Sequence, residues 1–284
     1  MKLLMLKGLP ASGKSTYAKE IVMGGGNWVR ANKDLIRTML HFDKWSGRNE
    51  AVTAEQEWWT VKHWLNHGKN VVIDDTNLGQ SHLDRWSNLA KECNATFEVK
   101  NFDTSLGECL IRDLQRDKKV GSAVIMNMAM QYNLFPDIED IVVCDIDGTV
   151  ADCSHRQHHV RGDKKDWKAF FGDMEYDKPR RDIYNQVSEL AGKKGAAIIF
   201  VSARPETYRG VTERWLGQRG MMFTHLIMRG AHDKRPDTEV KQNILDKYLK
   251  HYNIIKVFDD RPSVIRMWKE NGLDVEDVGN GEEF

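Results

Sequence analysis

The sequence lacks an excess of charge of either sign. Its 284 residues include 42 Lys and Arg and 42 Asp and Glu, so the formal net charge is zero with histidine neutral. Proteins that coat long stretches of nucleic acid need a surplus of cations to displace counterions from the phosphates. The balance therefore argues against nonspecific coating, but it is compatible with a protein that grips one phosphorylated end.

Long apolar runs and paired cysteines are also missing. The longest apolar runs, such as residues 196–201, are too short to span a bilayer, and the apolar stretch at the start is too brief for a signal peptide. The four cysteines form no CxxC pair and are too sparse for a disulfide scaffold or a zinc site. We therefore expect a soluble protein with no membrane partner in a reducing, cytoplasmic setting.

Short runs rich in Val, Ile and Leu recur between longer stretches with helical spacing. This alternation is typical of α/β folds with a parallel sheet, and the length favours two domains. The expected strands are residues 2–6, 27–31, 70–73, 96–101, 141–145, 196–201, 225–228 and 256–258. Because residues 133–140 (NLFPDIED) combine a proline with acidic residues, we expect a boundary there, between domains 1–137 and 138–284.

Residues 8–15 read GLPASGKS and match the pattern G-x-x-x-x-G-K-[ST] between an expected strand and helix. In this motif, backbone N–H groups surround a polyphosphate at a helix N-terminus. Lys14 would reach the β and γ phosphates of ATP, and Ser15 would ligate Mg²⁺. The flanking elements disfavour the alternative of a plain glycine turn. The expected ATP-binding residues are Gly8, Leu9, Pro10, Ala11, Ser12, Gly13, Lys14, Ser15 and Thr16.

Asp34 and Arg37 follow the second expected strand. The carboxylate of Asp34 could accept the proton of an attacking hydroxyl. Arg37 lies one helical turn later, and its planar guanidinium suits a phosphate on the acceptor. The alternative, left open by these residues alone, is that Asp34 caps a helix beginning at Leu35 and that Arg37 is solvated.

The third expected strand ends in Asp74 and Asp75. One of them could support Mg²⁺, while Asp75, Thr76 and Asn77 offer polar contacts to an acceptor. The same residues are also common in turns and helix caps.

Arg112 and Arg116 are spaced i and i+4 on an expected helix. On one face of that helix they could close over the ATP phosphates as a lid. Without the phosphate loop, such a basic stretch would be better explained as a solvated helix face.

The second half opens with a pair of carboxylates, Asp145 and Asp147, at the end of a buried-looking strand. Gly148 allows a sharp turn, so both carboxylates can converge on one phosphate. Asp145 would attack phosphorus to give an aspartyl-phosphate, and Asp147 would protonate the leaving alcohol and later activate water. A structural turn is the alternative.

Further candidates follow later strands in a fixed order. Ser202 and Arg204 would hold phosphoryl oxygens, and Lys241 would neutralise the intermediate. Carboxylates suit a hard cation such as Mg²⁺. The expected metal ligands are Ser15, Asp145, Asp147, Asp259 and Asp260.

Two further clusters receive no assigned role. His155, His158 and His159 could bind a transition metal, although contact with substrate or a solvated loop explains them better. The nine tryptophans, including Trp58 and Trp59, could stack on nucleobases, but at helical spacing they are more often part of a core or interface.

Taken together, the motifs GLPASGKST, NKDLIR, DDTNL, DIDGT, VSAR and DDR resemble the phage polynucleotide kinase 3′-phosphatase family over nearly the whole chain. The second half separately resembles haloacid-dehalogenase-type acylphosphatases. The resemblance implies ATP-dependent phosphorylation of 5′-hydroxyl ends of DNA or RNA and removal of 3′-phosphates, including 2′,3′-cyclic ones, with Mg²⁺ at both sites. It also implies a homo-oligomer in the cytoplasm of a phage-infected bacterium, coupled to a ligase.

By the same resemblance, Asp34 is the kinase base, Arg37 binds the acceptor phosphate, and Arg116 acts with Arg112 as the lid. In the phosphatase, Asp145 is the nucleophile and Asp147 the acid and base. The residues that it implies on phosphate are Arg156, Ser202, Arg204, Arg229 and Lys241.

Two other functions remain as alternatives. A small-metabolite kinase fused to a small-molecule phosphatase would use the same folds, but Arg37 would then lack an acceptor phosphate to bind. A non-enzymatic, nucleotide-gated binding module would not need both sets of catalytic residues to be complete.

Overall fold

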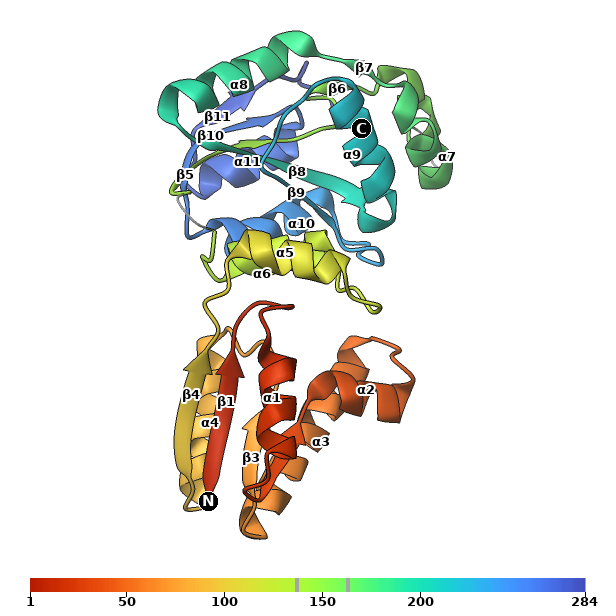
Figure 1. Ribbon diagram of the computed structural model, residues 1–284. Coiled ribbons are helices and arrows are strands. Elements are labelled where there is room, and N and C mark those ends of the chain that lie inside the picture. The colour runs from red at the N-terminus through yellow and green to blue at the C-terminus, as the bar shows by residue number, and fades with distance from the viewer. Residues whose placement is uncertain (136–137, 162–163, 284) are drawn as a thin grey trace. The chain divides into compact units, whose positions relative to one another are not determined.

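The computed structural model describes residues 1–135, 138–161 and 164–283. The chain separates into two compact units, Met1–Leu134 and Phe135–Phe284 (Figure 1). The expected boundary after residue 137 falls on residues that lie outside the described ones, so it stays a prediction. Both units are α/β with parallel sheets, which confirms the predicted fold class.

The first unit is built on a four-stranded parallel sheet in the order β2-β3-β1-β4. Its strands are β1 (Lys2–Lys7), β2 (Trp28–Ala31), β3 (Asn70–Ile73) and β4 (Thr96–Asn101). Its helices are α1 (Lys14–Met23), α2 (Lys33–His41), α3 (Gly47–Asn66), α4 (Gln80–Glu92), α5 (Leu106–Leu114) and α6 (Ser122–Gln131).

Both faces of this sheet are buried, because alternate residues of β1 point to opposite sides. Leu3 and Met5 pack with side chains of α3 and α4, including Trp86. Leu4 and Leu6 pack with Ala18 of α1 on the other face. The carboxyl ends of the strands, where parallel sheets place their ligands, therefore lie together at one edge.

The second unit is built on a five-stranded parallel sheet in the order β11-β10-β5-β8-β9. Its strands are β5 (Asp140–Cys144), β8 (Ala197–Pro205), β9 (His225–Arg229), β10 (Asn253–Asp259) and β11 (Val275–Asp277), and the short strands β6 (Ala151–Asp152) and β7 (Lys178–Pro179) form an antiparallel pair. Its α-helices are α7 (Trp167–Gly172), α8 (Arg181–Lys194), α9 (Arg209–Gln218), α10 (Asp237–Ile244) and α11 (Pro262–Glu270).

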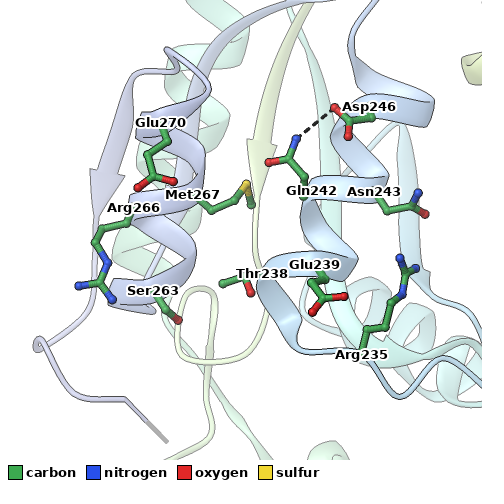
Figure 2. Close-up of a pocket in the computed structure, with 10 residues that line it drawn as sticks. All are labelled: Arg235, Thr238, Glu239, Gln242, Asn243, Asp246, Ser263, Arg266, Met267 and Glu270. Atoms are coloured by element: carbon green, nitrogen blue, oxygen red, sulfur yellow. Dashed lines mark hydrogen bonds between the residues drawn. The ribbon is translucent and has the colours of Figure 1, made fainter.

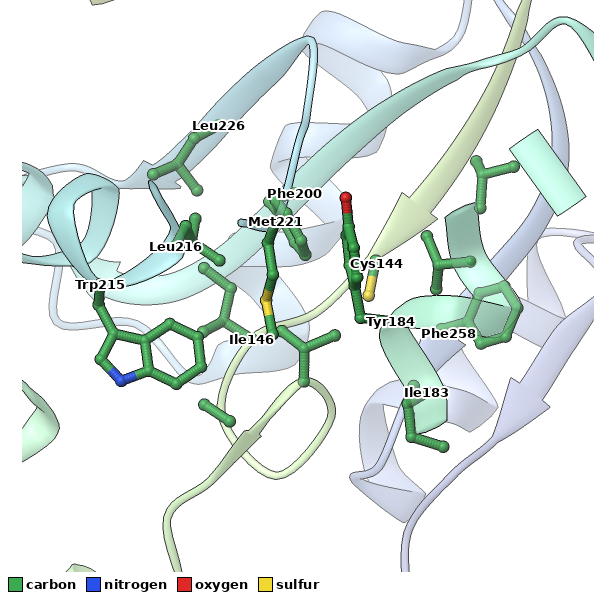
Figure 3. Packing of buried hydrophobic residues seen from close by; sticks show 14 of the residues in the cluster. Cys144, Ile146, Ile183, Tyr184, Phe200, Trp215, Leu216, Met221, Leu226 and Phe258 are labelled. Atoms are coloured by element: carbon green, nitrogen blue, oxygen red, sulfur yellow. The ribbon is translucent and has the colours of Figure 1, made fainter. Parts of the chain in front are cut away.

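The largest core of this unit lies on one face of its sheet (Figure 3). Cys144 and Phe200 come from neighbouring strands, whereas Tyr184 belongs to α8 and Trp215 to α9. These contacts fix β5, and with it the carboxylates that follow, at the centre of the sheet.

All eight expected strands are present, with ends that differ from the prediction by up to four residues. Strands β6, β7 and β11 were not predicted, because two or three residues are too few to show an alternating pattern. Among the described residues, every helix is too short or too polar to cross a bilayer.

Candidate active sites

The first candidate site lies at the carboxyl end of β1, where residues 8–13 turn into α1. Gly13 opens the helix with a φ of 100°, a left-handed conformation that favours glycine. Lys14 is buried, and its Nζ donates to the carbonyl oxygens of Gly8 (2.9 Å) and Leu9 (2.6 Å). Burial lowers the pKa of Lys14 to about 8. Its amino group is thus held inside the loop that would surround a polyphosphate.

Ser15 faces Asp74 at the end of β3, and its Oγ donates to Oδ1 over 3.2 Å. Arg30 of β2 donates its Nε to Oδ2 of the same carboxylate over 2.8 Å. Burial raises the pKa of Asp74, and the charge of Arg30 opposes that rise. A hydroxyl beside a carboxylate is a donor set that suits Mg²⁺. Of the two aspartates considered from the sequence, Asp74 is the one that contacts Ser15, and Arg30 had not been singled out.

Helix α2 is anchored to the end of β3 through its first residues. Asn32 caps the helix, because its Oδ1 accepts from the N–H of Leu35 (3.0 Å), and its amide donates to the carbonyl of Asp74. The backbone N–H of Lys33 donates to Oδ1 of Asp75 (3.1 Å). The alternative that Asp34 caps this helix is therefore wrong, since Asn32 makes the capping hydrogen bond.

Asp34 and Arg37 form an ion pair on α2, with Nη1 2.6 Å from Oδ1. The Asp34 side chain is 80% exposed, whereas that of Arg37 is 19% exposed. The guanidinium of Arg37 also donates to both oxygens of Glu50 on α3, with Nη2 2.9 Å from Oε2. Hydrogen bonds to Glu50 raise the pKa of Arg37 against the effect of burial. Glu50 was not a candidate from the sequence, and it holds Arg37 beside the exposed carboxylate.

Asp75 is buried beside a second carboxyl group, that of Glu57 on α3. Burial, followed by the neighbouring Asp75, raises the pKa of Glu57 to about 10. A neutral Glu57 donates to Asp75, which in turn accepts from the backbone of Lys33. The pair therefore joins α3, β3 and the start of α2. Nothing in the local sequence around Glu57 distinguishes it from a surface glutamate.

Thr76 and Asn77 lie against the phosphate loop. The carbonyl of Thr76 accepts from the N–H of Gly8 (3.0 Å). The buried amide of Asn77 donates to the carbonyl of Leu6 (2.8 Å). The described contacts of these two residues thus support the backbone of β1 and the loop after it.

Arg112 and Arg116 lie near the phosphate loop, but not on one helix face. Helix α5 ends at Leu114, so Arg116 belongs to the turn that follows, and the expected i, i+4 helical pair is wrong. Nη1 of Arg112 is 4.0 Å from the position that a Cβ on Gly13 would take, and the charge of Arg116 contributes to the lowered pKa of Lys14. Both side chains are almost half exposed.

The second candidate site lies at the carboxyl ends of β5 and β10. Lys241 of α10 places its Nζ 2.7 Å from Oδ1 of Asp145 and 2.8 Å from Oδ2 of Asp259. Oxygens of Asp145, Asp259 and Asp260 lie within 4.8 Å of one another. Burial raises the pKa of Asp145 well above its usual range and that of Asp260 to about 7. Three buried carboxylates with one lysine form a site that a divalent cation would stabilise.

The carboxylate of Asp147 is hydrogen-bonded to two arginines rather than to Lys241. Arg204 donates to it through Nε (2.9 Å) and Nη2 (2.5 Å), and Arg156 also donates to it. Burial alone would raise the pKa of Asp147, but the charges of Arg204 and Arg156 hold it below its usual range. Within the described residues Asp147 is not part of the carboxylate group that could hold a metal ion.

A fully buried aspartate, Asp177, joins the two arginines. Arg156 donates to it through Nε (2.7 Å) and Nη2 (2.6 Å), and Arg204 donates through Nη2 (3.1 Å). Asp177 was not predicted from the sequence, because it lies outside any motif, just before the short strand β7.

Ser202 lies at the same edge of the sheet as Asp145, because Cys144 is in register with Phe200. The side chain of Arg229 is directed to the loop that follows β9. Its guanidinium donates to the carbonyls of Ala203 (2.8 Å) and Arg235 (2.7 Å) and to the carboxylate of Asp237. These hydrogen bonds hold the loop after β9. They occupy the guanidinium of Arg229, so no bound phosphate is needed to explain its position.

The histidines of residues 155–159 contact acids. Nε2 of His155 is 3.0 Å from Asp177, and Nε2 of His159 is 3.2 Å from Asp173. Among the described residues, Asp145, Asp259 and Asp260 are the only set of three or more His, Cys, Asp or Glu side chains whose ligand atoms lie close enough together to hold a metal ion. The histidine cluster is therefore better explained by these polar contacts than by a transition metal.

An open groove lies between α10 and α11, and Figure 2 shows the side chains that line it. Gln242 and Asp246 are hydrogen-bonded along its wall (3.0 Å). The groove is lined by two arginines and two glutamates among other polar residues, and it includes none of the predicted site residues. The residues that line it are Arg235, Thr238, Glu239, Gln242, Asn243, Asp246, Ser263, Arg266, Met267 and Glu270.

Comparisons with known proteins agree with this two-part organisation. The chain is 28% identical over 298 residues to a protein of Autographa californica nuclear polyhedrosis virus named as a bifunctional polynucleotide kinase/RNA ligase, covering 95% of this chain and 41% of that protein. It is 29% identical over 135 residues to the L-seryl-tRNA(Sec) kinase of Methanococcus maripaludis, covering 46% of this chain and 52% of that one. The chain thus spans only about half the length of these relatives, or less.

Among solved structures, a chain of a Pnkp1/Rnl/Hen1 complex is 25% identical, with coverage of 99% of this chain and 97% of that one and a TM-score of 0.44. A family model described as an AAA domain matches residues 3–135. A model described as the polynucleotide kinase PNKP phosphatase domain matches residues 139–283, more than half of the chain. The chain therefore belongs to the polynucleotide kinase PNKP phosphatase-domain family, as the resemblance of its motifs predicts.

Proposed function

We propose that this chain heals the ends of broken nucleic acids with two activities. The first unit transfers the γ-phosphate of ATP to 5′-hydroxyl ends of DNA or RNA. The second removes 3′-phosphates, including 2′,3′-cyclic ones. The observation that carries the proposal is that each unit has a buried lysine where a phosphate could bind, Lys14 in the loop before α1 and Lys241 between Asp145 and Asp259. The family match over residues 139–283 supports a polynucleotide substrate.

The donor nucleotide binds in the loop before α1. Backbone N–H groups and the ammonium of Lys14 bind the β and γ phosphates of the nucleotide. The negative charge of these phosphates raises the pKa of Lys14, which burial lowers in the empty loop. Ser15 and Asp74 would hold Mg²⁺, which supplies positive charge to these phosphates when it is bound. Arg112 and Arg116 are exposed beside the loop and contribute charge to the transferring phosphoryl group.

The acceptor binds at the start of α2. Its 5′-oxygen attacks the γ-phosphorus while the bond from this phosphorus to the β,γ-bridging oxygen breaks, and Asp34 takes the hydroxyl proton. Arg37, held by Glu50, binds a phosphate of the acceptor strand. That phosphate replaces Asp34 on the guanidinium and leaves the carboxylate available to the hydroxyl. Asp75 supports this geometry through the backbone of Lys33.

In the second unit an oxygen of Asp145 attacks the 3′-phosphate, and the bond from phosphorus to the 3′-oxygen breaks. The substrate dianion draws the charges of Arg156 and Arg204 away from Asp147, and the Asp147 carboxylate then takes up a proton from solvent and gives it to the leaving oxygen. In the second half-reaction Asp147 takes a proton from water, which attacks phosphorus and releases Asp145 and inorganic phosphate. Ser202, Arg204 and Lys241 bind the phosphoryl oxygens.

The carboxylates of Asp145, Asp259 and Asp260 fit Mg²⁺ by their chemistry and spacing. A bound Mg²⁺ would neutralise their mutual repulsion and the charge of the phosphate. Asp147 contacts two arginines and is not among these three carboxylates, so we assign it to proton transfer and not to the metal.

Several finer assignments rest on the resemblance of the motifs. We propose that the protein acts in the cytoplasm of an infected bacterium, as a homo-oligomer, and hands its 5′-phosphate and 3′-hydroxyl ends to a ligase. The four free cysteines are compatible with a reducing compartment. The name of the viral relative, which includes an RNA ligase, supports the coupling to ligation.

One substrate tests both activities. An oligonucleotide with a 5′-hydroxyl and a 3′-phosphate is incubated with ATP and Mg²⁺, and both ends are read out. We expect the chain to gain a phosphate at the 5′ end and lose one at the 3′ end. Transfer from ATP only to nucleosides or sugars in a parallel panel would refute the proposal in favour of a metabolite kinase.

A further inference from the structure

Two aromatic side chains of the first unit lie uncovered on the segment between α2 and α3. Phe42 is 90% exposed and Trp45 is 71% exposed. Aromatic side chains of this size usually contribute to a core or an interface, because burying them is favourable. Leaving both in water points to a ligand that covers them.

The backbone of this segment is held in place. Oγ1 of Thr38 donates to one oxygen of Asp43 (2.5 Å), and Nζ of Lys118 donates to the other (2.7 Å). The amide of Asn49 donates to the carbonyl of Lys44 (2.7 Å). Phe42 itself adopts a left-handed conformation, with a φ of 49°. The two rings are therefore presented by an ordered backbone and lose little conformational freedom on binding a ligand.

Cations alternate with the aromatics along the same segment, which reads FDKWSGR over residues 42–48. Lys44 and Arg48 are exposed, and neither takes part in an ion pair with any residue that the structure describes. Aromatic rings interleaved with cations are the combination that binds single-stranded nucleic acids, since the rings stack on bases and the cations contact phosphates.

The segment also continues directly from the acceptor site. Phe42 lies eight residues after Asp34 on α2, which corresponds to about 12 Å along the helix axis. Nucleotides in a stacked strand are spaced by about 3.4 Å, so this span corresponds to about three or four nucleotides. Phe42 is the C-cap residue of this helix, so its ring is presented at the C-terminal end of α2. A strand with its 5′ end at Asp34 can therefore reach the segment.

We propose that Phe42 and Trp45 stack on unpaired bases a few nucleotides inside the 5′ end of the acceptor strand, and that Lys44 and Arg48 contact its phosphates. The ligand is the polynucleotide itself, in single-stranded form and of any sequence, because every base presents a face for stacking. This inference rests on the proposed kinase activity and adds a second subsite to it. The unit thereby prefers a strand over a lone nucleotide.

The test compares a 5′-hydroxyl dinucleotide with a single strand of about 12 nucleotides as kinase acceptors. We expect F42A and W45A together to raise KM for the longer strand about tenfold or more, with kcat and the KM for the dinucleotide unchanged. F42W should retain the wild-type KM. W59A, which removes another exposed tryptophan on α3, is the matched control, and an unchanged kcat with the dinucleotide reports that the first unit of each variant is folded.

An equal KM for the longer strand in F42A/W45A and in the wild type would overturn the inference. The inference would also be overturned if F42A/W45A sedimented as a smaller species than the wild type with the same KM for the longer strand. The two rings would then form contacts between copies of the chain. Failure of the wild type to phosphorylate either acceptor would remove the proposed kinase activity itself, and this outcome is distinct from a loss of length preference alone.

Discussion

Lys241 places its ammonium 2.7 Å from Oδ1 of Asp145, so the proposed nucleophile of the second unit is paired with a buried cation. Burial would lower the pKa of Lys241, but Asp145 and Asp259 outweigh it and raise the pKa. The ammonium is therefore charged throughout the pH range of enzyme assays. It offsets negative charge both in the resting site and in an aspartyl-phosphate.

The first prediction concerns this nucleophile. Asp145→Asn keeps the size of the side chain and removes the charge that attacks phosphorus, so we expect release of 3′-phosphate to become undetectable. Transfer from ATP to 5′-hydroxyl ends should stay within about twofold of wild type, because the kinase site lies in the other unit. End-labelled oligonucleotides report both rates. Loss of both activities in a protein with an unchanged melting temperature would contradict the assignment of separate sites.

The second prediction concerns Asp34. Since its carboxylate is 80% exposed, Asp34→Ala should change the free energy of unfolding by no more than about 0.5 kcal/mol. Removal of a general base should slow 5′ phosphorylation about 10²- to 10⁴-fold, with 3′-phosphatase activity retained. Glu20→Ala, which removes an exposed carboxylate on α1, serves as the control. Kinase activity that survives in Asp34→Ala would assign the proton transfer to another group.

The third prediction is a pH dependence of nucleotide binding. Burial lowers the pKa of Lys14 to about 8 in the nucleotide-free protein, and ATP requires the charged form. The affinity for ATP should therefore fall above pH 8, by up to about tenfold per pH unit. Calorimetric titration with Mg²⁺ and ATP from pH 6.5 to 9.5 measures this slope. A flat profile in the wild type would show that Lys14 keeps its proton in the empty loop.

Lys14 should also affect folding stability, with a definite sign. A lysine whose pKa is lower in the folded state than in the unfolded state contributes stability above the unfolded pKa of 10.5, and that contribution is lost as pH falls through about 8. Lys14→Met removes this dependence. Its free energy of unfolding should change less between pH 8 and 10 than that of the wild type in urea titrations.

The fourth prediction concerns Glu57, whose pKa is raised to about 10 by burial and by Asp75. A carboxyl group with a raised pKa contributes stability that is complete below the unfolded pKa of 4.5 and is lost as pH rises through about 10. Glu57→Gln keeps a neutral donor to Asp75, so it should retain kinase activity and flatten the fall in stability with rising pH. Glu57→Ala leaves Asp75 without that donor and should lower stability at pH 7. Equal effects of the two substitutions would argue against a proton shared with Asp75.

The fifth prediction tests the close packing beside the proposed metal ligands of the second unit. Gly148 has a φ of 80°, and a Cβ there would lie 1.9 Å from Oδ2 of Asp260. Gly148→Ala should therefore displace Asp260, destabilise the protein by about 1–3 kcal/mol and abolish 3′-phosphatase activity. Gly195 has a similar φ of 67° with open space around it, so Gly195→Ala measures the backbone cost alone. If Gly148→Ala and Gly195→Ala have equal phosphatase activity, the position of Asp260 is not needed for catalysis, and Asp260 is not a metal ligand.

Much of this protein could be predicted from the sequence because its motifs are local. Parallel strands are buried on both faces, so β1, β5, β8 and β10 are visible as short apolar runs, and polar residues at their carboxyl ends fall at one sheet edge. That reasoning was enough to identify Lys14, Asp145 and their neighbours as candidates. It also predicted the fold class, which the sheets of both units confirm.

Other features depend on contacts between segments that are distant in the chain. Glu50 holds Arg37, Arg30 holds Asp74, and Asp177 joins Arg156 to Arg204. None of these partners belongs to a motif. Their roles follow from burial, because a charged group taken out of water requires an opposite charge, and only the folded backbone determines which residue supplies it.

The sequence alone therefore determined which residues could carry phosphate chemistry, since phosphate loops and strand-end carboxylates are specified by residues that are adjacent in the chain. Tertiary structure decided which groups are charged and where they point. It placed Arg116 beyond the end of α5, turned Arg229 towards its own loop, and left Phe42 and Trp45 in water. Helix ends, ion pairs and exposure depend on the whole packed unit, which no short stretch of sequence specifies.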